Sequence, residues 1–371
     1  MLVIGIFTFD VTGSPFVVTL MLFARLLPMG VFGIFGGLIS DHFDRRRTLL
    51  FVFSLMAALS ACLGIIGFAG SLTVWHVGIG SFIAGMVWVT DFPVRRTLLS
   101  EIAGPERTHR AMSLDIMSSS GTRVLGPLLG GTLYATLGIG GAFIATAMGY
   151  LLCVLILLPL RHRDGRPGID RPSPLQSIID GFLELRRNRT LVGIFVVTII
   201  FNLWGFPFTS MIPVIGKDVL SLAPDAVGLL ASSEGLGSLL GGTLLALYAP
   251  GHWARYLYVG GVGGYLLVII AFGLSSDIWL SAVTLTIAGL AGAGFAAMQS
   301  ALVLIVSTEE TRARMMGILS MCIGTGLLGF LHLGWLADAI GPGPACVVLG
   351  IEGTVALIVS LWLFPELLRR Q

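Results

Sequence analysis

Charged residues are scarce in this chain of 371 residues. Only 11% of them are Asp, Glu, Lys or Arg, and 55% are hydrophobic, whereas soluble domains carry about 25% charged residues. So few charges cannot cover a water-facing surface, and lipid must therefore form part of the solvent. The net charge is +2, with no basic tail and no acidic run, which argues against a nucleic-acid partner.

Lysine, histidine and cysteine are too few or too scattered for the sites that they form in enzymes and pumps. The single lysine, Lys217, is followed by Asp218 instead of serine or threonine, so there is no phosphate-binding loop of the Walker type. The histidines have no metal-ligand spacing, and the cysteines lie unpaired in apolar stretches, where we expect small core residues. We therefore expect no metal, no cofactor and no enzymatic activity. These residues are His42, His76, His109, His162, His252, His332, Cys62, Cys153, Cys322 and Cys346.

Long apolar runs are abundant, and runs of about 20 uncharged residues predict membrane-spanning helices. Residues 1–10 are too short to cross a hydrocarbon core of about 30 Å, so we expect the end of a further helix there. No basic segment precedes this run, and Asp10 follows it, which argues against a signal peptide. The predicted spans are 16–40, 48–69, 73–98, 110–137, 139–160, 191–216, 224–249, 255–275, 278–306, 313–338 and 343–365.

Positive charges fall on every second connection between the predicted spans, and so on one side of the membrane. Nineteen of the 22 basic residues fall on one side, while Lys217 lies on the other and Arg25 and Arg123 lie within spans. Because cytoplasmic loops carry the excess of Lys and Arg, we expect the arginine-rich connections in the cytoplasm. The longest connection, 162–190, contains an apolar stripe of helical period from Leu175 to Leu183, which predicts an amphipathic linker helix on the membrane surface.

An internal repeat divides the chain into two halves. Residues 121–138 align with 324–341, with identical glycines in both segments, and Gly36-Gly37 aligns with Gly241-Gly242 at nearly the same offset. We therefore predict an all-α membrane protein of two pseudo-symmetric six-helix bundles, residues 1–161 and 191–371, joined by the linker. It would have eleven full transmembrane helices and a stub of helix 1. By symmetry, helix 1 should begin about 15 residues before Met1, so we expect in-frame coding sequence upstream.

The loop after the first full span, from Gly37 to Arg47, resembles the signature loop of the major facilitator superfamily. The matching residues are Gly37, Asp41, Arg45 and Arg46, whereas His42 and Asp44 depart from the family pattern. The resemblance implies that Asp41 belongs to a conformational latch between the two halves. The alternative is a loop that is merely positive on the cytoplasmic side.

Two further segments narrow the resemblance. Gly126, Pro127, Gly130 and Gly131 are similar to the core of an antiporter motif of exporters, although an ordinary packing helix is the alternative. Asp91-Phe92-Pro93-Val94-Arg95 resembles a stretch of a bacterial exporter subfamily that includes enterobactin-exporter-like proteins. The resemblance implies a multi-pass transporter of the bacterial inner membrane that exports a small molecule and is driven by protons, and we expect it to be a monomer. Uptake of a metabolite, or uniport, is the alternative.

Ionisable residues within spans are costly and mark candidate sites for proton coupling or cavity charge. Arg25, Arg123 and Glu234 lie deepest, and we expect Arg123 and Glu234 to pair across the two halves because their depths agree. Asp91 and Asp115 lie nearer the span ends, where Asp91 could pair locally with Arg95 and Asp115 could be solvated or cap a helix. Glu352 has no partner that the sequence identifies. Candidate cavity-lining residues, for which plain packing is the alternative, are Trp88, Asn202, Trp204 and Gln299.

Overall fold

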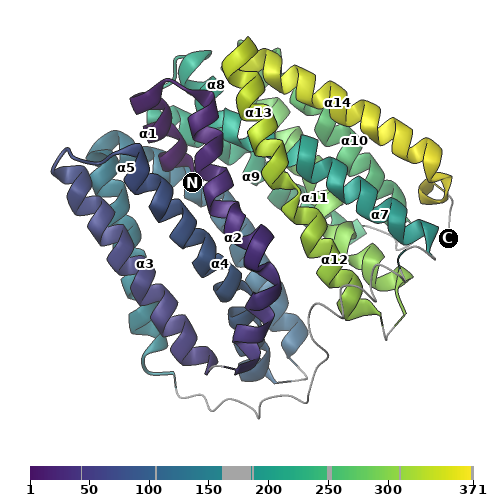
Figure 1. Ribbon diagram of the computed structural model, residues 1–371, viewed down its shortest axis with the longest axis horizontal. Coiled ribbons are helices and arrows are strands. Elements are labelled where there is room, and N and C mark those ends of the chain that lie inside the picture. Colours follow the sequence, from purple (N-terminus) through teal and green to yellow (C-terminus); the bar gives the residue numbers. More distant parts are fainter. Residues whose placement is uncertain are drawn as a thin grey trace.

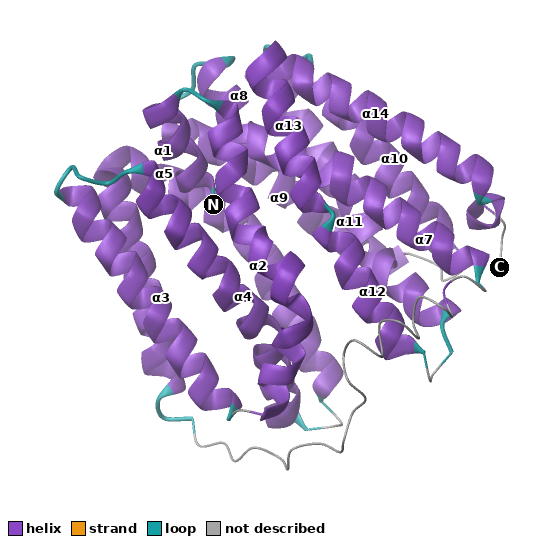
Figure 2. Cartoon of the chain, in the orientation of Figure 1, coloured by secondary structure: helices purple, strands orange, loops and turns teal. Residues whose placement is uncertain are grey.

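The computed structural model describes residues 1–42, 44–104, 107–160, 185, 188–248, 253–308 and 311–368. Within these ranges all regular structure is helical, as Figure 2 shows. The predicted linker helix lies outside the described residues, as do the side chains of Gly37 and Asp41.

The N-terminal bundle consists of α1 (Leu2–Thr12), α2 (Pro15–His42), α3 (Arg45–Phe68), α4 (Val74–Ala103) and α5 (Thr108–Leu157). α5 contains two of the predicted spans, because the chain turns at Gly138 with φ 67° and ψ −172°. A side chain would be strained in that conformation, so glycine permits the turn.

The C-terminal bundle begins with a broken helix over residues 189–218. This helix, which we call helix 7, passes from α7 (Arg189–Ile200) through a π-helical segment η1 (Phe201–Gly205) and a 3-10 segment η2 (Phe206–Ser210) into α8 (Met211–Asp218). Pro207 has no N–H to donate to the carbonyl of Leu203, so the regular hydrogen-bond ladder is interrupted there. The bundle continues with α9 (Pro224–Tyr248), α10 (Ala254–Gly273), α11 (Ile278–Val306), α12 (Arg312–Gly324), α13 (Gly326–Ile340), α14 (Pro342–Leu363) and η4 (Pro365–Leu368).

The predicted span pattern is confirmed in the described part of the chain. Ten apolar segments are long enough to cross a membrane, and one of them, within α5, holds two crossings separated by Gly138. α11 has the predicted bounds of 278–306 because Asp277 caps it by accepting from the Leu280 backbone N–H at 2.9 Å. α1 is the expected short helix at the start.

The two bundles lie side by side and approach each other most closely at one end (Figure 1). This end holds the connections 13–14, 69–73, 219–223 and 274–277, and we call it the arginine-poor side. All four cysteines are free, but only Cys322 and Cys346 are buried. The expectation of small core residues is thus wrong for Cys62 and Cys153, which lie on exposed faces of α3 and α5.

Candidate functional site

The antiporter-like segment makes a close contact between the bundles through Gly131 and the Pro127 carbonyl. A Cβ atom on Gly131 of α5 would lie 2.9 Å from Gly228 Cα of α9, and one on Gly228 would lie 2.6 Å from the Pro127 carbonyl oxygen. Ser232 of α9 also donates to the Val124 carbonyl of α5 at 2.8 Å. Small residues therefore let the two backbones touch at this crossing.

Polar contacts close the arginine-poor side. Asp10 of α1 forms an ion pair with Lys217 of α8 at 2.8 Å and accepts a hydrogen bond from the Tyr134 hydroxyl at 3.0 Å. Asp338 of α13 accepts from the Ser14 hydroxyl at 3.1 Å and from the Phe16 backbone N–H at 3.0 Å. Both carboxylates thus bridge the two bundles.

On the opposite, arginine-rich side, the described polar contacts stay within a bundle. Arg45 pairs with Glu101 of α4 at 2.7 Å, and Arg46 donates to the carbonyl of Leu158 at 2.5 Å, beside the end of α5. Arg45 and Arg46, which both match the signature loop, therefore make contacts within the N-terminal bundle in this structure. Figure 1 shows the ends of α2 and α4 diverging from those of α11 and α12 on this side.

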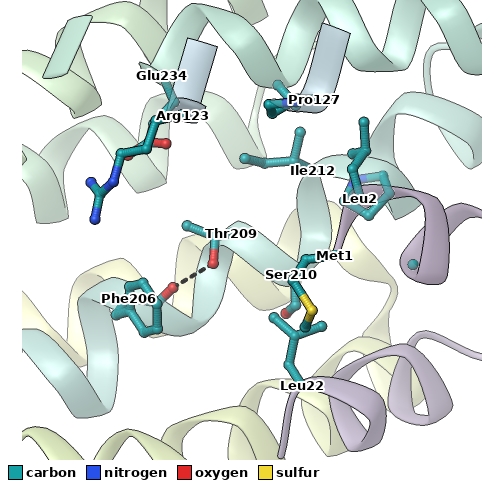
Figure 3. A pocket seen from close by; sticks show the side chains of 13 residues that line it. Met1, Leu2, Leu22, Arg123, Pro127, Phe206, Thr209, Ser210, Ile212 and Glu234 are labelled. Carbon is teal, nitrogen blue, oxygen red and sulfur yellow. Dashed lines mark hydrogen bonds between the residues drawn. The ribbon is translucent and has the colours of Figure 1, made fainter. Parts of the chain in front are cut away.

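Between the bundles lies a cavity of about 280 Å³. Its wall is mostly apolar, and its polar groups are two opposite charges and two hydroxyls (Figure 3). Thr209 and Ser210 donate their hydroxyl hydrogens to the backbone of helix 7 at 2.9 and 2.7 Å, which leaves their oxygens to accept from a ligand. The lining residues are Met1, Leu2, Gly5, Leu22, Arg123, Pro127, Phe206, Thr209, Ser210, Ile212, Pro213, Ala231 and Glu234.

Arg123 of α5 and Glu234 of α9 both line this cavity, one from each bundle (Figure 3). Within the described contacts, no nitrogen–oxygen distance of 4.0 Å or less joins the two side chains. The two residues face the same cavity, but the predicted direct pair is not formed in this conformation. The cavity therefore presents two separate charges of opposite sign.

The two acids near the span ends take part in one network with arginines. Asp115 of α5 is nearly buried and contacts Arg95, and its other oxygen lies 3.2 Å from Arg96. Asp91 lies 3.7 Å from Arg95, one turn away, so the local pairing is confirmed. The alternative of a solvated or capping Asp115 is wrong, because two arginines on α4 hold it in place.

Arg25 lies elsewhere in the N-terminal bundle. It is partly buried on α2. Its side chain makes no hydrogen bond or ion pair with the described residues, and it is absent from the lining of the cavity.

The four aromatic and amide candidates do not line the cavity described above. Asn202 is buried and donates to the Thr198 carbonyl at 2.9 Å, while Gln299 is buried and reaches the Thr198 hydroxyl at 3.4 Å. Trp204 donates to Glu352 of α14 at 3.0 Å, and Trp88 lies exposed on α4. Contacts within the C-terminal bundle therefore account for Asn202, Trp204 and Gln299, and none of the three lines the cavity.

Other residues of the interface were not anticipated. Asp10 and Lys217 lie near the ends of α1 and α8, where charges are ordinary, and their pairing links segments more than 200 positions apart. The signal in the sequence was the isolation of Lys217, the sole basic residue on its side. Phe206, Thr209 and Ser210 all line the cavity and lie in the 3-10 segment η2, which a regular helical period does not predict.

The chain is similar to known membrane proteins over nearly its whole length. Residues 4–365 match a family described as transmembrane secretion effector. The chain belongs to this family of major facilitator transporters. It is therefore a multi-pass membrane protein and a transporter of small molecules.

Individual relatives of this transporter are distant. The staphyloferrin A transporter of Staphylococcus aureus is 23% identical over 89% of this chain and 83% of its own length. The macrolide efflux protein A of Streptococcus pyogenes is 23% identical over an alignment that covers 75% of this chain and 65% of that protein. A bacterial homologue of the human lysosomal transporter Spinster, solved in an inward-facing and unoccupied conformation, has a TM-score of 0.69 at 17% identity, covering 99% of this chain and 91% of that one.

Proposed function

We propose that this transporter exports a small molecule across a bacterial inner membrane in exchange for protons, as a monomer, with its arginine-rich loops in the cytoplasm. The observation that carries the proposal is the pair of opposite charges, Arg123 and Glu234, facing one apolar cavity between the bundles. The efflux and transport names of its relatives support export of a drug, siderophore or metabolite. Uptake or uniport of a metabolite is the competing function.

The conformation fits one end state of an alternating-access cycle. The bundles are joined by the ion pair and hydrogen bonds on the arginine-poor side, and they diverge on the arginine-rich side. With the arginine-rich side in the cytoplasm, this state is inward-facing. In the outward-facing state, Asp41 and the arginines of the signature loop would close the cytoplasmic side.

Glu234 is the group that we assign to the proton. A charged carboxylate facing an apolar cavity is costly, so it is stabilised either by a proton or by a nearby cation. Arg123 supplies that cation from the other bundle, and rocking of the bundles changes the separation of the two groups. Loss and gain of a proton at Glu234 would thereby follow the conformational change.

The test measures efflux from cells loaded with a macrolide or with staphyloferrin A, with and without an uncoupler. Proton-coupled export predicts efflux that slows when the uncoupler collapses the gradient. Accumulation from outside would instead favour the uptake function, and efflux insensitive to the uncoupler would contradict proton coupling.

A charge exchange tests the roles of the two residues. Arg123→Glu and Glu234→Arg should each abolish transport, and the double exchange should recover part of it because the cavity regains one charge of each sign. A double variant no better than either single reversal would refute the assignment. Asp41→Asn should impair transport in a folded protein if Asp41 belongs to the latch.

A further inference from the structure

Glu352 of α14 is hydrogen-bonded to two other helices of the C-terminal bundle. Trp204 of helix 7 donates its indole N–H to Glu352 Oε2 at 3.0 Å, and His332 Nε2 of α13 lies 2.8 Å from the same oxygen. Gly353 lets α14 approach helix 7 here, because a Cβ on Gly353 would lie 2.8 Å from the Cβ of Trp204. The cluster is separate from the cavity described above.

The His332–Glu352 pair lies at mid-depth on the outer surface of the bundle. Glu352 follows Pro342 by ten residues, which places it about 15 Å along a helix, half of a hydrocarbon core of about 30 Å. His332 lies on the same face of α13 as Leu328 and Trp335, which are 63% and 64% exposed. The exposed face of α13 beside the pair is therefore turned toward lipid.

An ionisable pair in this position needs a reason, because polar groups facing lipid are costly and rare. A carboxyl and an imidazole that share one proton are neutral overall, which keeps the cost low. Asp218 lies exposed at the end of α8, and the other charged groups on the packed elements lie near helix ends and have partners of their own. These groups are Arg189 with Glu366, Lys217 with Asp10, Arg255 with the Glu366 carbonyl, and Asp338 with Ser14.

Trp204 connects the pair to the cavity. It lies in the π-helical segment of helix 7, and the next residues, Phe206, Thr209 and Ser210, line the cavity. A π-helical turn followed by a 3-10 turn has weaker backbone hydrogen bonds than an α-helix, so side-chain contacts must fix its shape.

We propose that Glu352 and His332 are positioning residues for transport. They hold the indole of Trp204, and through it the break in helix 7, so that the segment from Phe206 to Ser210 faces the cavity. This role goes beyond the proposed function and depends neither on proton coupling nor on the direction of transport.

The test uses a cysteine reporter at Thr209 in protein whose four native cysteines are replaced by alanine. The reaction rate of Thr209→Cys with a water-soluble maleimide is measured in nanodiscs. Glu352→Leu, His332→Leu and Trp204→Phe should each change this rate about fivefold, the effect of one net hydrogen bond. Glu352→Gln keeps an acceptor for Trp204 and should retain most of the original rate.

A second reporter, Leu22→Cys, lies on the cavity wall of the other bundle and should keep its rate in all of these variants. Combining Trp204→Phe with Glu352→Leu should add little to either single change, because both remove the same bond. An unchanged Thr209→Cys rate in Glu352→Leu would overturn the proposal. Equal changes at both reporters, or Glu352→Gln acting like Glu352→Leu, would also overturn it, and thermal melting confirms that each variant is folded.

Discussion

The two bundles share one arrangement of helices but are stabilised by different forces. In the C-terminal bundle a continuous core of buried apolar side chains runs through helix 7 and α9–α14. It contains stacked aromatic rings, such as those of Phe201 and Phe295, whose centroids lie 3.8 Å apart. Among the described residues of the N-terminal bundle, the buried clusters are small, one between α3 and α4 and one around α1. There, ion pairs link α3, α4 and α5 near the arginine-rich side. A repeated fold therefore does not imply a repeated source of stability.

Asp115→Asn should reduce the stability of the N-terminal bundle more than the other substitutions considered below. Asp115 is 2% exposed and contacts two arginines that are 36% and 41% exposed, so its loss leaves both without their shared carboxylate. We expect a loss of about 3 kcal/mol of stability, the lower end for breaking a buried pair because the arginines reach water. Thermal unfolding in detergent measures the effect, and Asp218→Asn on the exposed end of α8 is the control. Equal melting of the two variants would show that the ion pairs do not hold the N-terminal bundle.

Sequence patterns predicted the membrane-spanning helices well. Apolar runs and the alternation of arginines placed the spans to within a few residues, because a bilayer demands helices of nearly fixed length. Asp91 and Arg95 could be paired from their spacing on one helix. The contact of Asp115 with α4 could not be predicted, since it depends on how two helices rotate against each other.

Gly131→Ala tests the contact that joins the two bundles. The added Cβ would lie 2.5 Å from the Pro224 carbonyl oxygen and 2.9 Å from Gly228 Cα, so the backbones must separate. We expect a loss of about 2 kcal/mol in stability, within the range for overpacking, together with reduced transport. Gly126→Ala, in the same segment, meets nothing within 4 Å and should be neutral or slightly stabilising. Similar behaviour of the two variants would contradict the close crossing of α5 and α9.

Lys217→Gln should have the smallest effect and should act on conformation more than on folding. It removes the ion pair with Asp10 that joins the bundles on the arginine-poor side. A partly exposed pair contributes about 1 kcal/mol at most, so the population closed on that side should fall by about fivefold relative to the open one. Labelling of Ala231→Cys by an impermeant maleimide from the arginine-poor side should rise accordingly. Arg189→Gln, which breaks an ion pair within the C-terminal bundle, is the control and should leave the labelling unchanged.

The candidate site was harder to predict than the fold. The depths of Arg123 and Glu234 followed from a rise of about 1.5 Å per residue along a helix, and both line the cavity. Asn202 and Trp204 lie in the π-helical segment of helix 7, whose side-chain directions a regular helical period does not describe. Gln299 contacts Thr198 of helix 7 instead of the cavity, a contact that depends on how α11 packs against helix 7. The partners of Glu352 come from two other helices, and their contact depends on tertiary packing alone.

Alternating access is tested most directly by measuring two distances between the bundles under the same conditions. Spin labels are placed in cysteine-free protein at Ser71 and Ser276 on the arginine-poor side, and in a second sample at Arg107 and Thr308 on the arginine-rich side. Alternating access around a central cavity predicts that the two distances change in opposite directions. Conditions that lengthen the Ser71–Ser276 distance should shorten the Arg107–Thr308 distance. Glu234→Gln should alter the pH at which these distances change. Distances that change in the same direction, or that stay fixed while transport proceeds, would contradict it.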